Sequence, residues 1–153
     1  MKAALHPISP EQHTLISQAQ RSRLREDLDR LDTQRAMVAA IKAGVRQQAL
    51  AEALGVSQGA VSQRLKIARD ASAVPDGFAG ASPREIAQRY ALGQLDQTTL
   101  VRQLTAWPYP PRDDESGDHP WEEVAEAVDR GWITHDEYEQ VLLGRGLPLT
   151  SAG

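Results

Sequence analysis

Apolar residues recur at helical spacing along most of the chain. The clearest case lies in residues 58–69, where Val61, Leu65 and Ala68 are separated by four and three residues and form one stripe of a helix. Segments of the same kind lie on both sides of residues 71–82. The pattern predicts an all-α protein. We expect a tri-helical N-terminal domain preceded by a long helix, and a small C-terminal domain of about four helices.

Two short helices joined by a tight turn are predicted in residues 47–66. Ala51 supplies a small side chain where the helices touch, and Gly55 can take the positive φ that ends the first helix. Ser57 is placed to cap the second helix, and Val56 is expected to turn inward. The residues expected to share the core are Leu50, Leu54, Val61 and Leu65. This is the sequence pattern of a helix-turn-helix.

The face of the second helix opposite its apolar stripe is polar. The major groove of DNA admits one helix, in which glutamine can pair with adenine through two hydrogen bonds and serine can bond to any base edge. Gln58, Ser62 and Gln63 are therefore candidate base readers, and Gly59 would let the helix approach the bases closely. Positive charge farther along the helix would meet phosphate. The predicted phosphate contacts are Arg46, Gln47, Ser57, Lys66 and Arg69.

Residues 34–70 resemble the tri-helical helix-turn-helix domain of phage Cro and repressor proteins and of many small bacterial regulators. The matching positions are Gln47, Ala51, Leu54, Gly55, Val56, Gln58 and Val61. The resemblance implies that residues 34–42 form the first of three helices. Arg46 departs from the pattern, because such domains usually carry a serine or threonine cap there; this helix end could instead meet a phosphate. The alternative interpretation is an ordinary hairpin of a helical bundle.

The composition narrows the classes of function. A chain of 153 residues forms one large or two small domains, and it has no cysteine for a disulfide, a thiolate zinc site or a thiol nucleophile. No apolar run approaches the roughly 18 residues of a membrane span, and no signal peptide is visible, so we expect a cytoplasmic protein. No catalytic triad, phosphate-binding glycine loop or zinc-protease motif occurs. We therefore expect neither an enzyme nor a cofactor.

The net charge of −4 hides two halves of opposite sign. Residues 1–70 contain 11 lysines and arginines against 7 acidic residues, a net +4, whereas residues 71–153 contain 6 against 14, a net −8. All seven aromatic residues lie in the second half, beginning with Phe78. We therefore expect a basic DNA-binding domain in residues 1–70 and an acidic domain with its own core in residues 83–147.

The expected domains are joined by residues 71–82, whose small residues, proline and glycines are typical of a linker. At the N-terminal end, Ser9 and Pro10 predict a helix start, and a long polar helix is expected to reach about Leu31. Apolar residues at heptad spacing in this region could join two copies of the chain or pack within their own domain. They are Leu24, Leu28, Leu31 and Val38.

The acidic domain contains two similar segments offset by 38 residues. Each predicts a helical hairpin, in which a helix ends at Gly93 or Gly131 and the next is capped by Asp96 or Thr134. Between the hairpins, residues 107–119 contain three prolines and an acidic run, for which a solvated connection is a simpler interpretation than a metal site. Stretches of this domain resemble uncharacterised actinobacterial and actinophage proteins, which implies no activity.

We expect a sequence-specific regulator that binds double-stranded DNA, most simply a repressor of the phage-immunity or small-operon type. A second interpretation is an antitoxin whose acidic half neutralises a toxin, and a third is a helical adaptor without DNA binding. A homodimer could form through the N-terminal helix or the C-terminal domain. The acidic domain could also bind a protein partner, or present a second DNA or partner surface through Arg84, Arg89, Arg102 and Arg112.

Overall fold

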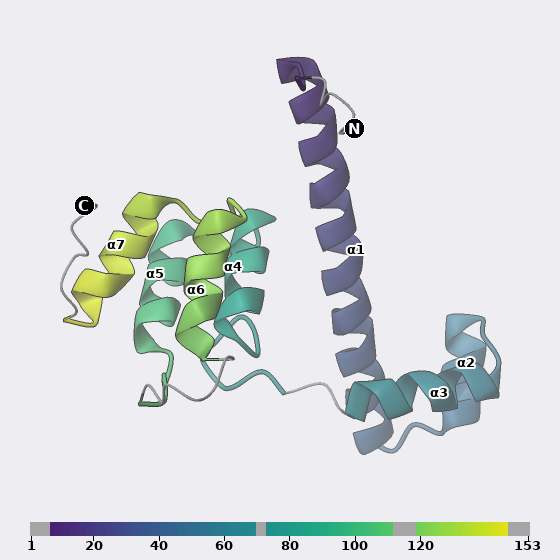
Figure 1. Ribbon diagram of the computed structural model, residues 1–153. Helices are drawn as coiled ribbons and strands as arrows, with labels where there is room; N and C mark the ends of the chain where they lie inside the picture. The colour runs from purple at the N-terminus through teal and green to yellow at the C-terminus, as the bar shows by residue number, and fades with distance from the viewer. Residues whose placement is uncertain (1–6, 70–72, 112–118, 147–153) are drawn as a thin grey trace, which may run out of the picture. The chain divides into compact units, whose positions relative to one another are not determined.

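The computed structural model describes residues 7–69, 73–111 and 119–146 of the chain. In these ranges the protein forms seven helices and no strand, which confirms the predicted all-α class (Figure 1). The chain divides between residues 70 and 71 into two compact units. The first unit contains α1 (Pro10–Lys42), α2 (Gln47–Leu54) and α3 (Gln58–Arg69). The second contains α4 (Pro83–Ala91), α5 (Gln97–Ala106), α6 (Pro120–Asp129) and α7 (His135–Gly144). No described helix is both long enough and apolar enough to cross a membrane.

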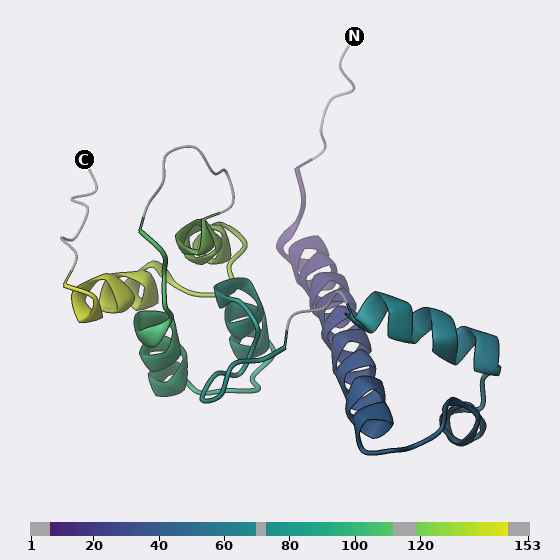
Figure 2. The ribbon, with the colours of Figure 1, turned by 90° about the horizontal axis from the view of Figure 1, so that it is seen from below.

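The helix α1 is continuous (Figure 2). The predicted break between a long helix ending near Leu31 and a separate helix over residues 34–42 is therefore wrong, because residues 34–42 are the last part of α1. It starts as predicted, because the Ser9 hydroxyl accepts a hydrogen bond from the Gln12 N–H at 3.1 Å and the Gln12 side chain accepts one from the Ser9 N–H at 2.9 Å. Neither glycine nor proline interrupts the region of the predicted break. There the Thr33 hydroxyl donates to the Asp29 carbonyl at 2.9 Å, which keeps its hydrogen bond within the helix.

A small apolar core holds α1, α2 and α3 together. Its buried residues are Met37, Ala51, Val61 and Leu65, and half-buried Val38, Ile41, Leu50 and Val56 pack around them. Leu54, the last residue of α2, is 41% exposed, so its predicted place in this core is wrong. Val56 packs there instead, after the chain has turned at Gly55. Val38 belongs to this core, so packing within its own domain is confirmed for that part of the heptad pattern.

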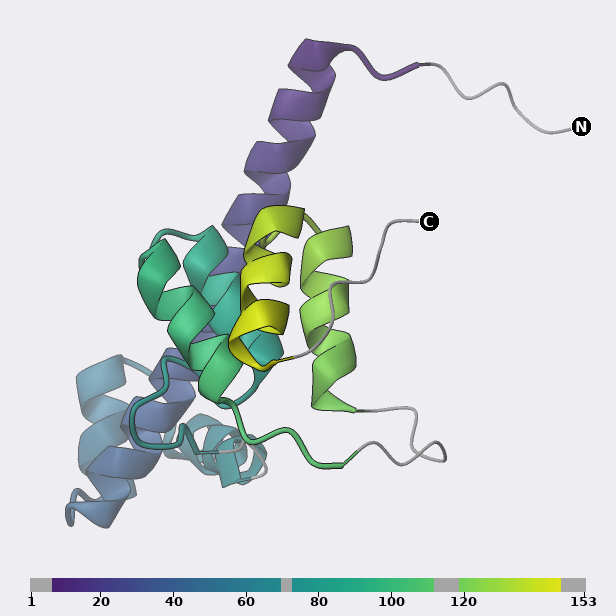
Figure 3. The same ribbon diagram turned by 90° about the vertical axis from the view of Figure 1, so that its left-hand side faces the viewer.

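The second unit consists of the two predicted helical hairpins, α4 with α5 and α6 with α7 (Figure 3). The repeat offset of 38 residues places α4 opposite α6 and α5 opposite α7, and these equivalent helices pack against each other. Gly93 and Gly131 take φ values of 78° and 74° where the first helix of each hairpin ends. Asp96 and Thr134 cap the second helices, as expected. The core is formed by Ile86, Ala87, Leu100, Leu104, Trp107, Val124, Ala127, Ile133 and Val141.

Part of the segment expected to be a linker belongs to the second unit. Phe78 packs edge-on against Trp107, with ring centroids 4.9 Å apart, and Gly80 is buried against Glu85. The Ala79 N–H also donates to the Gln103 side chain at 2.8 Å. The predicted start of this domain at residue 83 is therefore too late. The reason is the Phe78–Trp107 contact, because an aromatic pair contributes stability beyond the area that it buries. The small residues around Phe78 therefore do not make this segment a linker.

A buried carboxylate connects the two hairpins. Glu137, at the start of α7, is 2% exposed. It accepts hydrogen bonds from the Thr134 N–H at 2.7 Å and from the phenol of Tyr90, which lies in α4. One side chain thus completes the cap of α7 and fixes α7 against the first hairpin.

The stability of the second unit should fall at alkaline pH. The hydrogen bond to Glu137, with smaller contributions from burial and from the charge of Glu137, raises the pKa of Tyr90 from 10.0 to about 12. Because the folded-state pKa exceeds the unfolded value, this contribution is complete below about pH 10 and is lost as the pH rises towards 12. We expect the urea midpoint of unfolding to fall less in Tyr90→Phe than in the wild-type chain when the pH is raised from about 10 to about 12. Some fall should persist, because burial also raises the pKa of Tyr109. A fall of unchanged size in Tyr90→Phe would contradict this assignment.

Candidate nucleic-acid interface

The turn between α2 and α3 has the geometry that its sequence predicts. Gly55 adopts the left-handed conformation, with φ 69° and ψ 31°, and the Val56 N–H donates to the Ala51 carbonyl at 3.0 Å. The Ser57 hydroxyl then accepts from the Ala60 N–H at 3.1 Å, which caps the start of α3. These contacts fix the direction in which α3 leaves α2.

The burial of α3 is one-sided. Val61, Leu65 and Ala68 are buried, and every predicted DNA-reading residue of this helix is exposed. At 3.6 residues per turn, the positions that point most directly away from the buried stripe are Gly59, Gln63 and Lys66. One flank of this outward face carries Gln58, Ser62 and Arg69. The structure thus brings together on one helix all the residues predicted to read bases.

The space around Gly59 is open. Apart from its chain neighbours and the backbone of its own helix, the nearest atom to a Cβ built on this residue would be Ser57 Oγ, at 3.9 Å. Packing within the unit therefore does not explain the glycine, because a side chain would fit there. The backbone of α3 is therefore accessible at this position.

Two further residues of α3 are exposed that were not predicted to be part of the interface. Ile67 is 56% exposed and lies on the flank of the outward face opposite Ser62, and Arg64 is exposed farther round the helix. The sequence signal for Ile67 was its position, since it falls outside the spacing of Val61, Leu65 and Ala68. An isoleucine that the fold leaves uncovered here enlarges the candidate interface.

The residues before α3 that are predicted to contact phosphate differ in their exposure and in their hydrogen bonds. Arg46 is exposed at the N-cap of α2, and its side chain makes no capping hydrogen bond there to the described residues, as the sequence suggested. Gln47 is half-buried in the first turn of α2. Ser57 is exposed, although its hydroxyl is already used as a cap. The start of α2 therefore offers backbone N–H groups and one positive side chain.

The second surface predicted from four arginines is not assembled. Arg89 is 7% exposed and its guanidinium pairs with Glu85 at 2.8 Å, because it packs inside the second unit. Arg84 pairs with Glu126 of α6 at 2.8 Å. Arg102 is exposed, and Arg112 lies outside the described residues. Two of these arginines thus neutralise carboxylates of their own unit, which corrects the prediction that the four share an accessible face.

The acidic run of residues 113–118 lies outside the described ranges. Within those ranges, no three His, Asp or Glu side chains are arranged to hold a metal ion. Comparison of the chain with protein-family models, curated proteins and solved structures finds no match. Function is therefore inferred from the residues and geometry of the chain itself.

Proposed function

We propose that the protein is a sequence-specific DNA-binding regulator that inserts α3 into the major groove of duplex DNA. The outward face of α3 supports this proposal best, because it combines exposed uncharged polar residues with an unfilled space at Gly59 and lysine and arginine in its last turn. Such a face suits base edges near the helix start and phosphates near its end. A helix that served only to pack a bundle would need none of these features.

The contacts divide into two kinds. Gln58, Ser62 and Gln63 supply the amide and hydroxyl groups that recognise base edges. Lys66 and Arg69 supply charge for the phosphate backbone, which contributes affinity without sequence information. The acidic charge of residues 71–153 confines the attraction for DNA to the first unit.

Selection of bound sites from a random duplex library tests the proposal. We expect recovery of one short preferred sequence that contains adenine steps suited to glutamine. A single helix-turn-helix covers only about 600–1,000 Å², so a second contact is expected as well. A palindrome with half-sites about one helical turn apart would indicate a dimer, and an asymmetric site bound one-to-one would indicate a monomer. Recovery of no enriched sequence would contradict sequence-specific binding.

Gln63→Ala and Lys66→Ala should weaken binding in different ways. We expect Gln63→Ala to cost about 1–3 kcal/mol on the selected site and little on unrelated duplexes. Lys66→Ala should weaken binding to all sequences alike and reduce the salt slope of log affinity by about one. Fluorescence anisotropy on both duplexes at several salt concentrations measures these effects. Equal losses in sequence preference for the two variants would contradict the assigned roles.

Ile67 should contact the methyl group of a thymine, since apolar side chains recognise this group in the major groove. We expect replacement of one thymine of the selected site by uracil to weaken binding of the wild-type chain several-fold. The same replacement should have little effect on Ile67→Ala, because the methyl and its partner are then both absent. Additive losses from the two changes would show that Ile67 does not touch the thymine methyl.

The antitoxin interpretation is the second candidate, favoured by the opposite charges of the two halves of the chain. It predicts that the protein forms a stoichiometric complex with a toxin through its second unit while still binding DNA through its first. Co-purification of a toxin encoded next to this chain, and loss of that toxin's activity in the complex, would support it. The adaptor interpretation instead predicts no affinity for any duplex.

A further inference from the structure

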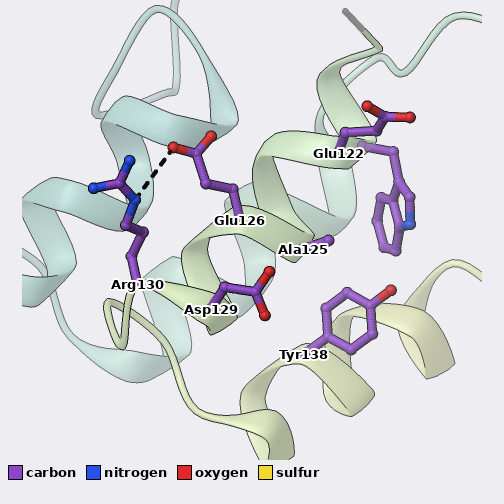
Figure 4. A pocket seen from close by; sticks show the side chains of 7 residues that line it. Glu122, Ala125, Glu126, Asp129, Arg130 and Tyr138 are labelled. Atoms are coloured by element: carbon purple, nitrogen blue, oxygen red, sulfur yellow. Dashed lines mark ion pairs between the residues drawn. The ribbon is translucent and has the colours of Figure 1, made fainter. Parts of the chain in front are cut away.

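The second unit carries an open groove between α6 and α7, with a volume of about 600 Å³ (Figure 4). Trp121 of α6 and Tyr138 of α7 supply its aromatic surface. Three carboxylates of α6 also line it, namely Glu122, Glu126 and Asp129. The groove thus combines aromatic rings with negative charge.

Arg130, the positively charged residue of the lining, already pairs with a carboxylate. Arg130 lies 3.8 Å from Glu126, and its guanidinium also sits over the ring of Trp132 at 5.9 Å. Glu126 is paired a second time, with Arg84 at 2.8 Å. In Figure 4, Glu126 and Arg130 point to the side of α6 away from Tyr138, whereas Asp129 lies nearer to it. On the other side of the groove, His135 stacks on Tyr138 with ring centroids 6.2 Å apart and pairs with Glu139 at 3.2 Å. Asp129 is therefore the carboxylate of the lining that lies nearer to Tyr138.

Asp129 is the best placed of these carboxylates to receive a cation. It is exposed, and it makes no ion pair within the described part of the chain. A cation that entered the groove would meet this carboxylate on one side and aromatic rings on the other. Residues 71–153 carry a net charge of −8, which would draw a positively charged segment to this unit over a longer range.

The aromatic rings of the groove pack against each other and against a third ring. Trp121 and Tyr138 have ring centroids 5.7 Å apart and a tilt of 41°, and the ring of Tyr109 packs edge-on against Trp121 at 5.1 Å. Both groove rings are half-buried, so part of their surface stays accessible. A guanidinium binds such rings by stacking while its N–H groups bind a carboxylate, a combination that the compact ammonium of lysine reproduces less well.

We propose that this groove binds an arginine side chain carried on an exposed basic segment of a partner protein. The guanidinium lies against Trp121 and Tyr138 and donates hydrogen bonds to Asp129, with Glu122 adding negative charge. This site is independent of the proposed DNA interface, because all its residues belong to the second unit. Its affinity for one short segment is modest, since exposed ion pairs contribute about 1 kcal/mol or less each.

The test uses the whole 153-residue chain and a capped glycine peptide that carries two arginines. We expect saturable shifts of the Trp121 indole N–H and of α6 and α7 amides in NMR spectra, with a dissociation constant below about 1 mM. The control peptide carries citrulline, which keeps the planar shape but lacks the charge, and it should bind at least about tenfold more weakly. Equal shifts with the two peptides, or no saturation by about 5 mM, would overturn the proposal.

Paired variants separate the groove from general acidity. Glu122→Gln with Asp129→Asn removes two charges from the lining and should weaken arginine-peptide binding about tenfold. Asp76→Asn with Asp136→Asn removes two charges from exposed positions of the same unit outside the groove, and should change binding less than about threefold. Equal weakening in the two pairs would show that the peptide senses only net charge, which would also overturn the proposal.

Discussion

Gly59→Glu should lower the affinity for the selected DNA site by about 100-fold or more, because like charges brought together at an interface cost several kcal/mol. The carboxylate would stand at the outward centre of α3, where the proposal places the edges of bases and the nearest phosphates. The fold should not suffer. Replacing a helical glycine gains about 0.5–1 kcal/mol, the space around Gly59 is open, and a negative charge suits the first turn of a helix.

The value of this variant is that stability and DNA binding change in opposite directions. Urea unfolding should show an unchanged or higher midpoint, while fluorescence anisotropy shows the loss of affinity. Ser22→Glu is the matched control, since it adds the same charge at an exposed position of α1 and should weaken binding only a few-fold through net charge. If both variants weakened binding equally, the outward face of α3 would not be the contact surface.

Glu137→Ala should destabilise the second unit by about 2–3 kcal/mol, because it removes one half of a capping box and leaves a phenol without its partner. The lost contacts are those to the Thr134 N–H and to Tyr90. The residue is almost completely buried, so water does not readily replace the carboxylate. Urea denaturation followed by far-ultraviolet circular dichroism measures the difference.

Glu139→Ala provides the comparison in the same helix. Glu139 pairs with His135 at 3.2 Å on the surface of α7, so its removal should cost no more than about 0.5 kcal/mol. Tyr90→Phe should fall between the two, because it removes the phenol and keeps the capping box intact. A cost for Glu137→Ala no greater than that for Glu139→Ala would mean that the buried carboxylate does not hold the hairpins together.

The turn between α2 and α3 was predictable because local sequence determines it. Gly55 and Ser57 act within one turn of their own positions, as a positive-φ helix end and as a helix cap. The same holds for Gly93, Gly131, Asp96 and Thr134 in the second unit. Spacing also identified the outward face of α3, since its buried stripe follows the helical period.

Contacts between distant residues were the part that sequence reasoning missed. The partner of Arg84 is Glu126, 42 residues away, and the partner of Phe78 is Trp107 in the following hairpin. Without these partners, an arginine resembles a surface charge and a segment rich in glycine resembles a linker. Leu54 was misplaced for a similar reason, because helical spacing groups it with Leu50 but does not show whether another element covers it.

The central claim is that α3 recognises a DNA sequence, and the ratio of affinities for two duplexes tests it most directly. Binding of the whole 153-residue chain should be measured at physiological salt on the selected site and on a duplex with the same bases in shuffled order. We expect the selected site to bind at least about 1,000-fold more tightly, the lower limit usual for specific recognition. Equal affinities for the two duplexes, or no binding to either, would contradict the proposed function.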